Sequence, residues 1–146
     1  MDISFIEEMP LGEISSHNRA NTKVSSEQIR QQLETEFKLR DSTETTGGPS
    51  RYARVANSDC KIGFISPMSN NFCSSCNRVR LTAEGRLLLC LGNEHSLDLR
   101  EILRSYPGDS ERLKTSIVRA MANKPERHYF DAEQTDIVRF MNMTGG

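Results

Sequence analysis

The spacing of three cysteines constrains this chain more than any other feature. Cys73 and Cys76 are separated by two residues, and Cys90 follows after thirteen more. A C-x2-C turn lets two thiolates approach one ion, and soft thiolates suit zinc or an iron–sulfur cluster better than magnesium or calcium. In a reducing cytosol, the four cysteines of this chain indicate metal ligands before disulfides. The cysteine pattern indicates a metal site.

The fourth ligand decides which metal is bound. The candidates are Cys60, thirteen residues before Cys73, and His95, five residues after Cys90, and neither stands in the spacing of a second zinc knuckle. Spacing alone favours zinc and a three-thiolate iron–sulfur cluster equally, and a set of unliganded cysteines is the third alternative. Three thiolates leave one iron of a 4Fe–4S cluster open to another ligand.

Two arginines follow the C-x2-C segment. Arg78 and Arg80 are two residues apart at the start of a predicted strand, so their side chains are expected on one face. A guanidinium pairs bidentately with phosphate or carboxylate, which suits an anionic substrate beside an open metal site. The alternative is a solvated strand face.

Composition limits the partners. The net charge of −1 gives no basic excess for nucleic acid, and no apolar run approaches the roughly 18 residues of a membrane span. A cytoplasmic protein is expected, with neither nucleic acid nor membrane as a partner. The 36% hydrophobic content is below the usual roughly 45–50%. This fits either a metal-stabilised fold or a piece of a larger protein.

Periodicity and turn residues outline the secondary structure. A buried strand is expected in residues 2–9, and a capping box at Ser25 and Gln28 begins a helix over 26–39. Residues 41–50 form turns or a linker. Further along are strands at 51–55 and 61–65, a hairpin of 78–82 and 86–91 around Gly85, and helices at 98–105 and from 109 or 110 onwards.

Four stretches of sequence carry a family resemblance. They are the pattern FC-x2-CNR-x-RLT-x-x-G-x-L-x-x-CL over 72–91, the earlier FIEEMPLGE and TGGPSRYARV, and the closing GG. Together they resemble the C-terminal portion of the GTP 3',8-cyclase family, also called molybdenum cofactor biosynthesis protein A, among the radical S-adenosylmethionine enzymes. The resemblance covers nearly the whole chain.

The resemblance implies a fold and a domain division. Residues 1–40 are expected to be the last strand and helix of an incomplete TIM-like radical SAM barrel, in an α/β class. Residues 41–146 are expected to form an α+β C-terminal iron–sulfur cluster domain with a β-hairpin. The family's N-terminal C-x3-C-x2-C motif has no counterpart here, so we expect a fragment. A truncated gene, a cloned domain and a split-gene product remain alternatives.

The resemblance also implies roles for particular residues. Three cysteines are expected to hold a 4Fe–4S cluster with an open iron where guanine docks, two arginines to bind GTP, and a diglycine tail to reach the active site: Cys73, Cys76 and Cys90; Arg78 and Arg80; Gly145 and Gly146. In some members of that family a basic residue just before the FIE stretch helps to bind substrate. Ser4 stands at that position here, so that role is not carried over to it.

The implied reaction belongs to the intact protein. With S-adenosylmethionine and a second 4Fe–4S cluster, it converts GTP to 3',8-cyclo-7,8-dihydro-GTP by radical chemistry, the first step of molybdenum cofactor biosynthesis. This chain alone is not expected to turn over GTP. Implied partners are GTP, the missing N-terminal barrel half and the downstream cyclic pyranopterin monophosphate synthase, and a homodimer is left open. The alternative function is a non-catalytic, zinc-stapled interaction module.

Overall fold

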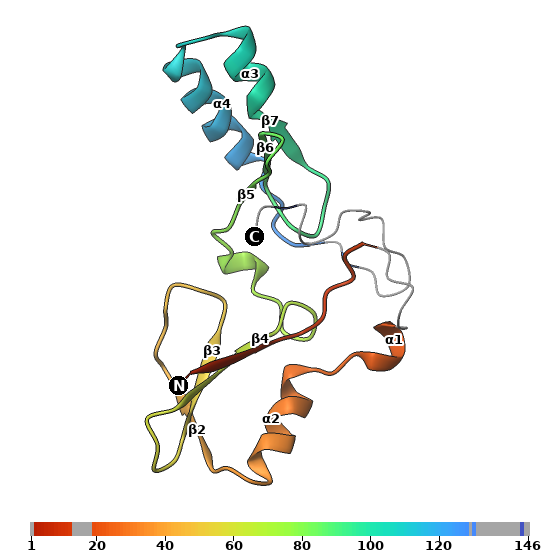
Figure 1. Ribbon diagram of the computed structural model, residues 1–146, viewed down its shortest axis with the longest axis vertical. Helices are drawn as coiled ribbons and strands as arrows, with labels where there is room; N and C mark the ends of the chain where they lie inside the picture. The colour runs from red at the N-terminus through yellow and green to blue at the C-terminus, as the bar shows by residue number, and fades with distance from the viewer. Residues whose placement is uncertain (1, 13–18, 129, 131–143, 145–146) are drawn as a thin grey trace. The chain divides into compact units, whose positions relative to one another are not determined.

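The computed structural model describes residues 2–12, 19–128, 130 and 144, in two compact units (Figure 1). The first unit comprises Met1–Met9 and Ser16–Phe72, and the second comprises Pro10–Ser15 and Cys73–Gly146. Helices and strands occur in both units, which confirms the mixed α/β class. None of the described helices combines the length and apolar content that a membrane crossing needs. The functional division into 1–40 and 41–146 stays a prediction.

A four-stranded sheet forms the first unit, in the order β1-β4-β3-β2. Strand β1 runs parallel to β4, whereas β4, β3 and β2 are antiparallel neighbours. The unit also contains helices α1 and α2. The bounds are Ile3–Ile6 for β1, Arg19–Thr22 for α1, Ser26–Glu34 for α2, Leu39–Ser42 for β2, Arg51–Val55 for β3 and Lys61–Ile65 for β4. Strands β3 and β4 match their predicted bounds.

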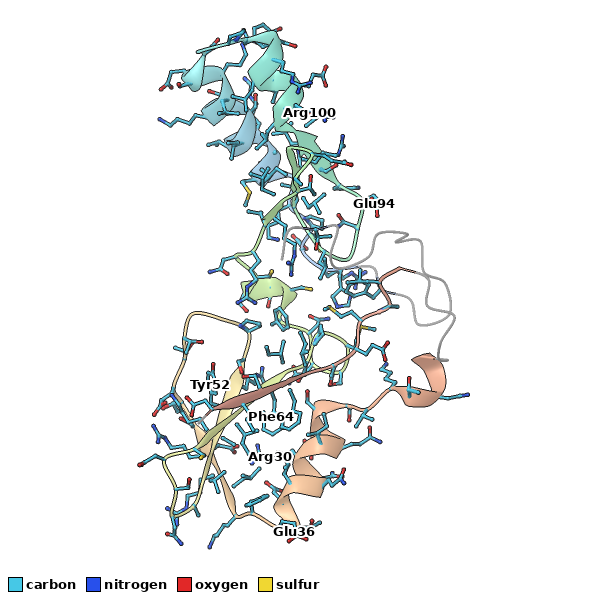
Figure 2. The ribbon with its side chains drawn as sticks, viewed as in Figure 1. Arg30, Glu36, Tyr52, Phe64, Glu94 and Arg100 are labelled. Atoms are coloured by element: carbon cyan, nitrogen blue, oxygen red, sulfur yellow. The ribbon has the colours of Figure 1, made fainter. Side chains whose placement is uncertain are left out.

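The core of the first unit lies between the sheet and α2. Ala53, Ile62 and Phe64 are buried, and Ile29 and Leu33 of α2 pack against them. Figure 2 shows Phe64 pointing from the sheet toward the helix. Sheet and helix thus cover each other's apolar faces, as a two-layer fold requires.

Helix α2 begins as predicted but ends early. The Ser25 side chain accepts from the Gln28 N–H, and the Gln28 side chain accepts from the Ser25 N–H, so the capping box is confirmed. The helix ends at Glu34 instead of residue 39. Leu39 already pairs with Val55 in the sheet, so the chain must leave the helix before that point. Arg30 then joins α2 to β2 through a 2.6 Å ion pair with Asp41 (Figure 2).

Strand β1 is present, but the prediction that it is buried is wrong for this chain. It lies at the edge of the sheet with β4 as its neighbour, and Ile3 and Ile6 are 46% and 55% exposed. Phe5 packs on the core, stacked on Phe64 with ring centroids 6.2 Å apart. An alternating strand at a sheet edge has one face toward the core and one row of unpaired backbone groups.

The chain after β1 carries a buried carboxylate. Glu7 is 2% exposed and accepts hydrogen bonds from the backbone N–H groups of Ser26, Met68 and Ser69 and from the Ser69 hydroxyl. Burial raises the pKa of the Glu7 carboxyl, but these hydrogen bonds outweigh burial and hold the pKa below its ordinary value. Glu7 therefore fixes the start of α2 and the loop after β4 to one point.

A three-stranded antiparallel sheet, β5-β6-β7, and helices α3 and α4 make up the second unit. Their bounds are Arg80–Leu81 for β5, Arg86–Leu88 for β6, Ser96–Asp98 for β7, Leu99–Ser105 for α3 and Ser110–Ala122 for α4. The predicted hairpin is confirmed, with Gly85 at a φ of 83° in its turn. Helices α3 and α4 lie side by side (Figure 1).

The core of the second unit is formed by residues of β6, of the position directly after β6 and of α4. Leu87, Leu89 and Ala120 are buried, with Leu97 and Ile117 packed against them. Leu89 stands directly before Cys90 in the chain. The backbone of Cys90 is therefore held in place by the buried residue that precedes it.

Candidate metal centre

One turn of 3-10 helix, η1 (Cys73–Ser75), carries the C-x2-C segment. The Cys76 N–H donates to the Cys73 carbonyl over 3.1 Å and closes the turn. Cys76 directly follows the 3-10 turn, so the two cysteines stand at the two ends of one closed turn. Both side chains are half-buried, and neither is in a disulfide.

The hairpin brings Cys90 to a loop held by hydrogen bonds on both sides. The Leu89 N–H donates to the His95 carbonyl over 3.3 Å. The Cys90 sulfur accepts from the Gly92 N–H, also over 3.3 Å. Cys90 is half-buried and in no disulfide. Its thiol thus has a backbone donor supplied by its own loop.

His128 is where two of the cysteine segments meet. Its backbone N–H donates to the Cys73 sulfur over 3.4 Å. A Cβ added at Gly92 would lie 2.5 Å from the His128 Cβ and 3.0 Å from the Phe130 ring. The stretch around His128 thus contacts both the Cys73 sulfur and the loop that holds the Cys90 sulfur.

The two predicted arginines lie between Cys76 and Cys90 in the chain. Arg80 begins β5, is half-buried, and lies opposite Leu88, two residues before Cys90. Arg78 is exposed. Neither guanidinium takes part in the ion pairs of the described residues. Their expected role in GTP binding, and the face that they share, stay predictions.

A hollow of about 840 Å³ lies beside β6, β7 and α4. Its lining includes Leu89, His95, Arg119 and Glu94, of which Glu94 is labelled in Figure 2. The volume falls in the range of ligand sites. Neither of the two predicted arginines lines it, so it is distinct from the anion site expected from the sequence.

The donor set fits a thiolate-bound metal chemically. Within the described ranges, no three His, Cys, Asp or Glu side chains are arranged as a metal-binding group. Cys60, one of the two candidate fourth ligands, belongs to the first unit. Half-buried thiols with N–H donors at the sulfur nevertheless match the surroundings that iron–sulfur clusters have in proteins. The three-cysteine site remains a prediction supported by this chemistry.

Gly145 and Gly146 lie outside the described residues, so the predicted position of the diglycine tail is not described. The residue directly before them, Thr144, is 1% exposed.

The supporting groups were missed by reasoning from sequence. The N–H groups of His128 and Gly92 donate to sulfur, and the Lys124 ammonium donates to two carbonyls. A backbone donor has no side-chain signature, because every residue except proline has an N–H. A lysine at the end of a helix ordinarily indicates a favourable interaction with the helix dipole.

The fold and these residues define a mixed α/β protein with three cysteines in one compact unit, two on a C-x2-C turn and one after a hairpin. The chain belongs to the Molybdenum Cofactor Synthesis C family, whose family model matches residues 1–130. The family relationship expected from the sequence is thus confirmed.

Three relatives that are similar to the whole chain are named GTP 3',8-cyclase or GTP 3',8-cyclase 2. A GTP 3',8-cyclase of Saccharophagus degradans is 61% identical over 147 residues, which are 100% of this chain and 44% of the relative. GTP 3',8-cyclase 2 of Pseudomonas aeruginosa is 58% identical with the same coverage. GTP 3',8-cyclase of Pseudomonas fluorescens is 59% identical over 148 residues, 100% of this chain and 45% of the relative. The chain therefore spans less than half the length of these relatives.

Proposed function

We propose that this chain is the part of a GTP 3',8-cyclase that holds a 4Fe–4S cluster through Cys73, Cys76 and Cys90 and binds GTP beside it. The intact protein would convert GTP to 3',8-cyclo-7,8-dihydro-GTP in molybdenum cofactor biosynthesis, with S-adenosylmethionine and a second cluster held elsewhere. Support comes from the family match over residues 1–130 and from the name that the similar relatives carry.

The observation that carries the proposal is the convergence on His128. Its N–H contacts the Cys73 sulfur, and its side chain abuts Gly92, whose N–H contacts the Cys90 sulfur. Donors aimed at sulfur stabilise thiolates, the form that binds metal. Three thiolates on a four-iron cluster supply, when the cluster is bound, one iron with an open position for a substrate atom.

The arginines would supply the charge that a nucleotide needs. Guanidinium groups bind phosphate bidentately, and those of Arg78 and Arg80 have no carboxylate partner among the ion pairs of the described residues. They are therefore available to neutralise the triphosphate. We also propose that Gly145 and Gly146 enter the active site, because they follow the buried Thr144 and a chain without side chains fits a crowded pocket.

The rest of the intact protein would complete the first unit. Strand β1 is an edge strand that leaves Ile3 and Ile6 exposed, so one of its sides is open to pair with a further strand. We therefore propose that β1 is the last strand of a TIM-like barrel. The missing part would carry the S-adenosylmethionine site, so this chain alone should form no cyclised product.

Metal analysis after anaerobic reconstitution with iron and sulfide tests the proposal. About four irons and four sulfides per chain are expected, as a 4Fe–4S cluster requires. The Cys90→Ser variant should lose the cluster. The matched change Cys60→Ser removes a half-buried thiol of the first unit and should keep it. A colourless protein with one tightly bound zinc, retained in Cys90→Ser, would contradict the proposal and favour a zinc-stapled module.

A further inference from the structure

Lys124, two residues after α4, makes contacts that no role in the proposed reaction uses. Its ammonium donates to the Leu89 carbonyl over 2.6 Å and to the Arg78 carbonyl over 2.9 Å. The side chain is half-buried, and no carboxylate pairs with it among the ion pairs of the described residues. Carbonyl oxygens accept hydrogen bonds from an ammonium without carrying the opposite charge that a carboxylate would bring.

The two carbonyls belong to the two segments that carry the cysteines. Arg78 is two residues after Cys76, and Leu89 directly precedes Cys90. One ammonium therefore joins the C-x2-C segment to the segment of the third cysteine. Strands β5 and β6 pair through Arg80 and Leu81, so Lys124 adds a second connection at the end of the hairpin that bears the cysteines.

The chain that follows Lys124 continues along the same segments. Four residues on, the His128 N–H donates to the Cys73 sulfur. His128 and Phe130 contact Gly92 so closely that a Cβ there would lie 2.5 Å from the His128 Cβ. The glycine is required for this approach, because real Cβ contacts are not that short. Lys124, His128 and Phe130 thus reach the segments of all three cysteines.

We propose that Lys124, His128 and Phe130 form a support that positions the three cysteines, with Lys124 as its anchoring residue and the His128 N–H as a donor to the sulfur of the ligand Cys73. The inference rests on the proposed cluster. Lys124 is a positioning residue, because it contacts the backbone of the ligand segments and not the metal. Outer contacts of this kind orient metal ligands and adjust the properties of the metal.

The support should affect the cluster in two ways. It holds the ligand segments together, so its loss should speed the release of iron. It also places an ammonium on the backbone of two ligand segments and an N–H donor on the Cys73 sulfur. Positive charge and hydrogen-bond donors both favour the more negative, reduced cluster. Its loss should therefore shift the reduction potential to more negative values, which a purely structural contact would not do.

Lys124→Met removes both the charge and the donors. After reconstitution of the chain with iron and sulfide, we expect iron release to a chelator to be about ten-fold faster, as for other outer-shell changes, and the midpoint potential to become more negative. Lys124→Arg keeps the charge and should restore the potential. The control Lys114→Met makes the same change at an exposed position of α4 and should match the unmodified chain.

Gly92→Ala tests the second contact without changing any charge. The added methyl must push His128 and Phe130 away, so the hydrogen bond to the Cys73 sulfur should be lost and the potential should fall. The control Gly108→Ala adds a methyl where no atom lies within 4 Å, although its φ of 80° adds local strain. It should leave the potential unchanged.

The outcomes separate this inference from the proposed function. If Cys90→Ser loses the cluster while Lys124→Met and Gly92→Ala keep the unmodified release rate and potential, the support is wrong and the cluster proposal stands. If the chain binds no cluster, both the proposed cluster and the proposed support are wrong. If Lys124→Met does not fold, as judged by circular dichroism, the comparison of Gly92→Ala with Lys124→Arg takes its place. A more negative potential in Gly92→Ala beside an unmodified potential in Lys124→Arg supports the inference. An unchanged potential in Gly92→Ala contradicts it.

Discussion

The Glu7 carboxylate accepts a 2.8 Å hydrogen bond from the backbone N–H of Ser26, which is nineteen residues further along the chain. The same carboxylate accepts from Met68 and Ser69, over 3.0 Å and 2.9 Å. One buried anion therefore fixes β1, the first residue of α2 and the loop that precedes the C-x2-C segment in sequence.

We expect Glu7→Gln to lower the free energy of unfolding by about 2 to 4 kcal/mol, because it removes a charged acceptor and faces backbone donors with an amide NH2 group. Urea denaturation measures this change. Glu36→Gln is the control: it makes the same substitution at an exposed position (Figure 2) and should change stability by less than about 0.5 kcal/mol. Equal effects of the two variants would contradict the role of Glu7.

The contribution of Glu7 should depend on pH. Its pKa in the folded chain is below the ordinary value of 4.5, so the unfolded chain takes up the proton first as pH falls. The stabilisation is therefore complete well above pH 4.5 and is lost as pH falls through the lowered pKa. The stability difference between the unmodified chain and Glu7→Gln should shrink from pH 7 to pH 3. A difference that stays constant or grows would be the opposite of this expectation.

Asp98 caps α3 and also pairs with Arg86. One oxygen accepts from the Glu101 N–H over 2.9 Å, and the other lies 3.4 Å from the Arg86 guanidinium. Asp98→Ala should cost about 1 to 2 kcal/mol. Asp98→Asn keeps a capping oxygen and loses the partly exposed ion pair, so it should cost under about 1 kcal/mol. Thermal unfolding measures the stability of both variants. A loss of stability in Asp98→Asn as large as that in Asp98→Ala would show that the ion pair, and not the cap, stabilises this region.

Arg78→Ala and Arg80→Ala should each weaken GTP binding about ten-fold or more, since a charged hydrogen bond contributes roughly 1.5 to 3 kcal/mol. The Lys124 contact should survive in Arg78→Ala, because it uses the Arg78 backbone carbonyl. Arg104→Ala removes an exposed guanidinium in the last turn of α3 and serves as the control. Titration calorimetry on the reconstituted chain gives the affinities; unchanged binding in the two variants would remove both arginines from the nucleotide site.

Much of the fold could be predicted from local signals. Strands β3 and β4 end at turn residues in the sequence, and their predicted bounds agree with the structure. Helix α2 did not end where its apolar spacing ended, since Phe37 is 48% exposed and Leu39 pairs in the sheet. Sheet pairing between distant segments decided that boundary, and apolar spacing within one segment carries no information about it.

Of the candidate metal centre, only the cysteine side chains could be predicted from the sequence. The spacing of the cysteines selects three thiols, and thiols have few other uses at that spacing. The support from Lys124 and the N–H of His128 depends on residues over thirty positions from Cys90 reaching its segment. Contacts of that range come from tertiary packing, and backbone donors have no preferred residue type.

The electron paramagnetic resonance spectrum of the reduced, reconstituted chain, recorded with and without GTP, tests the central claim most directly. A cluster held by Cys73, Cys76 and Cys90 has an open iron, so GTP should change the spectrum of the unmodified chain and of Cys60→Ser. No cluster signal at all, or a cluster signal that saturating GTP leaves unchanged, would contradict the account.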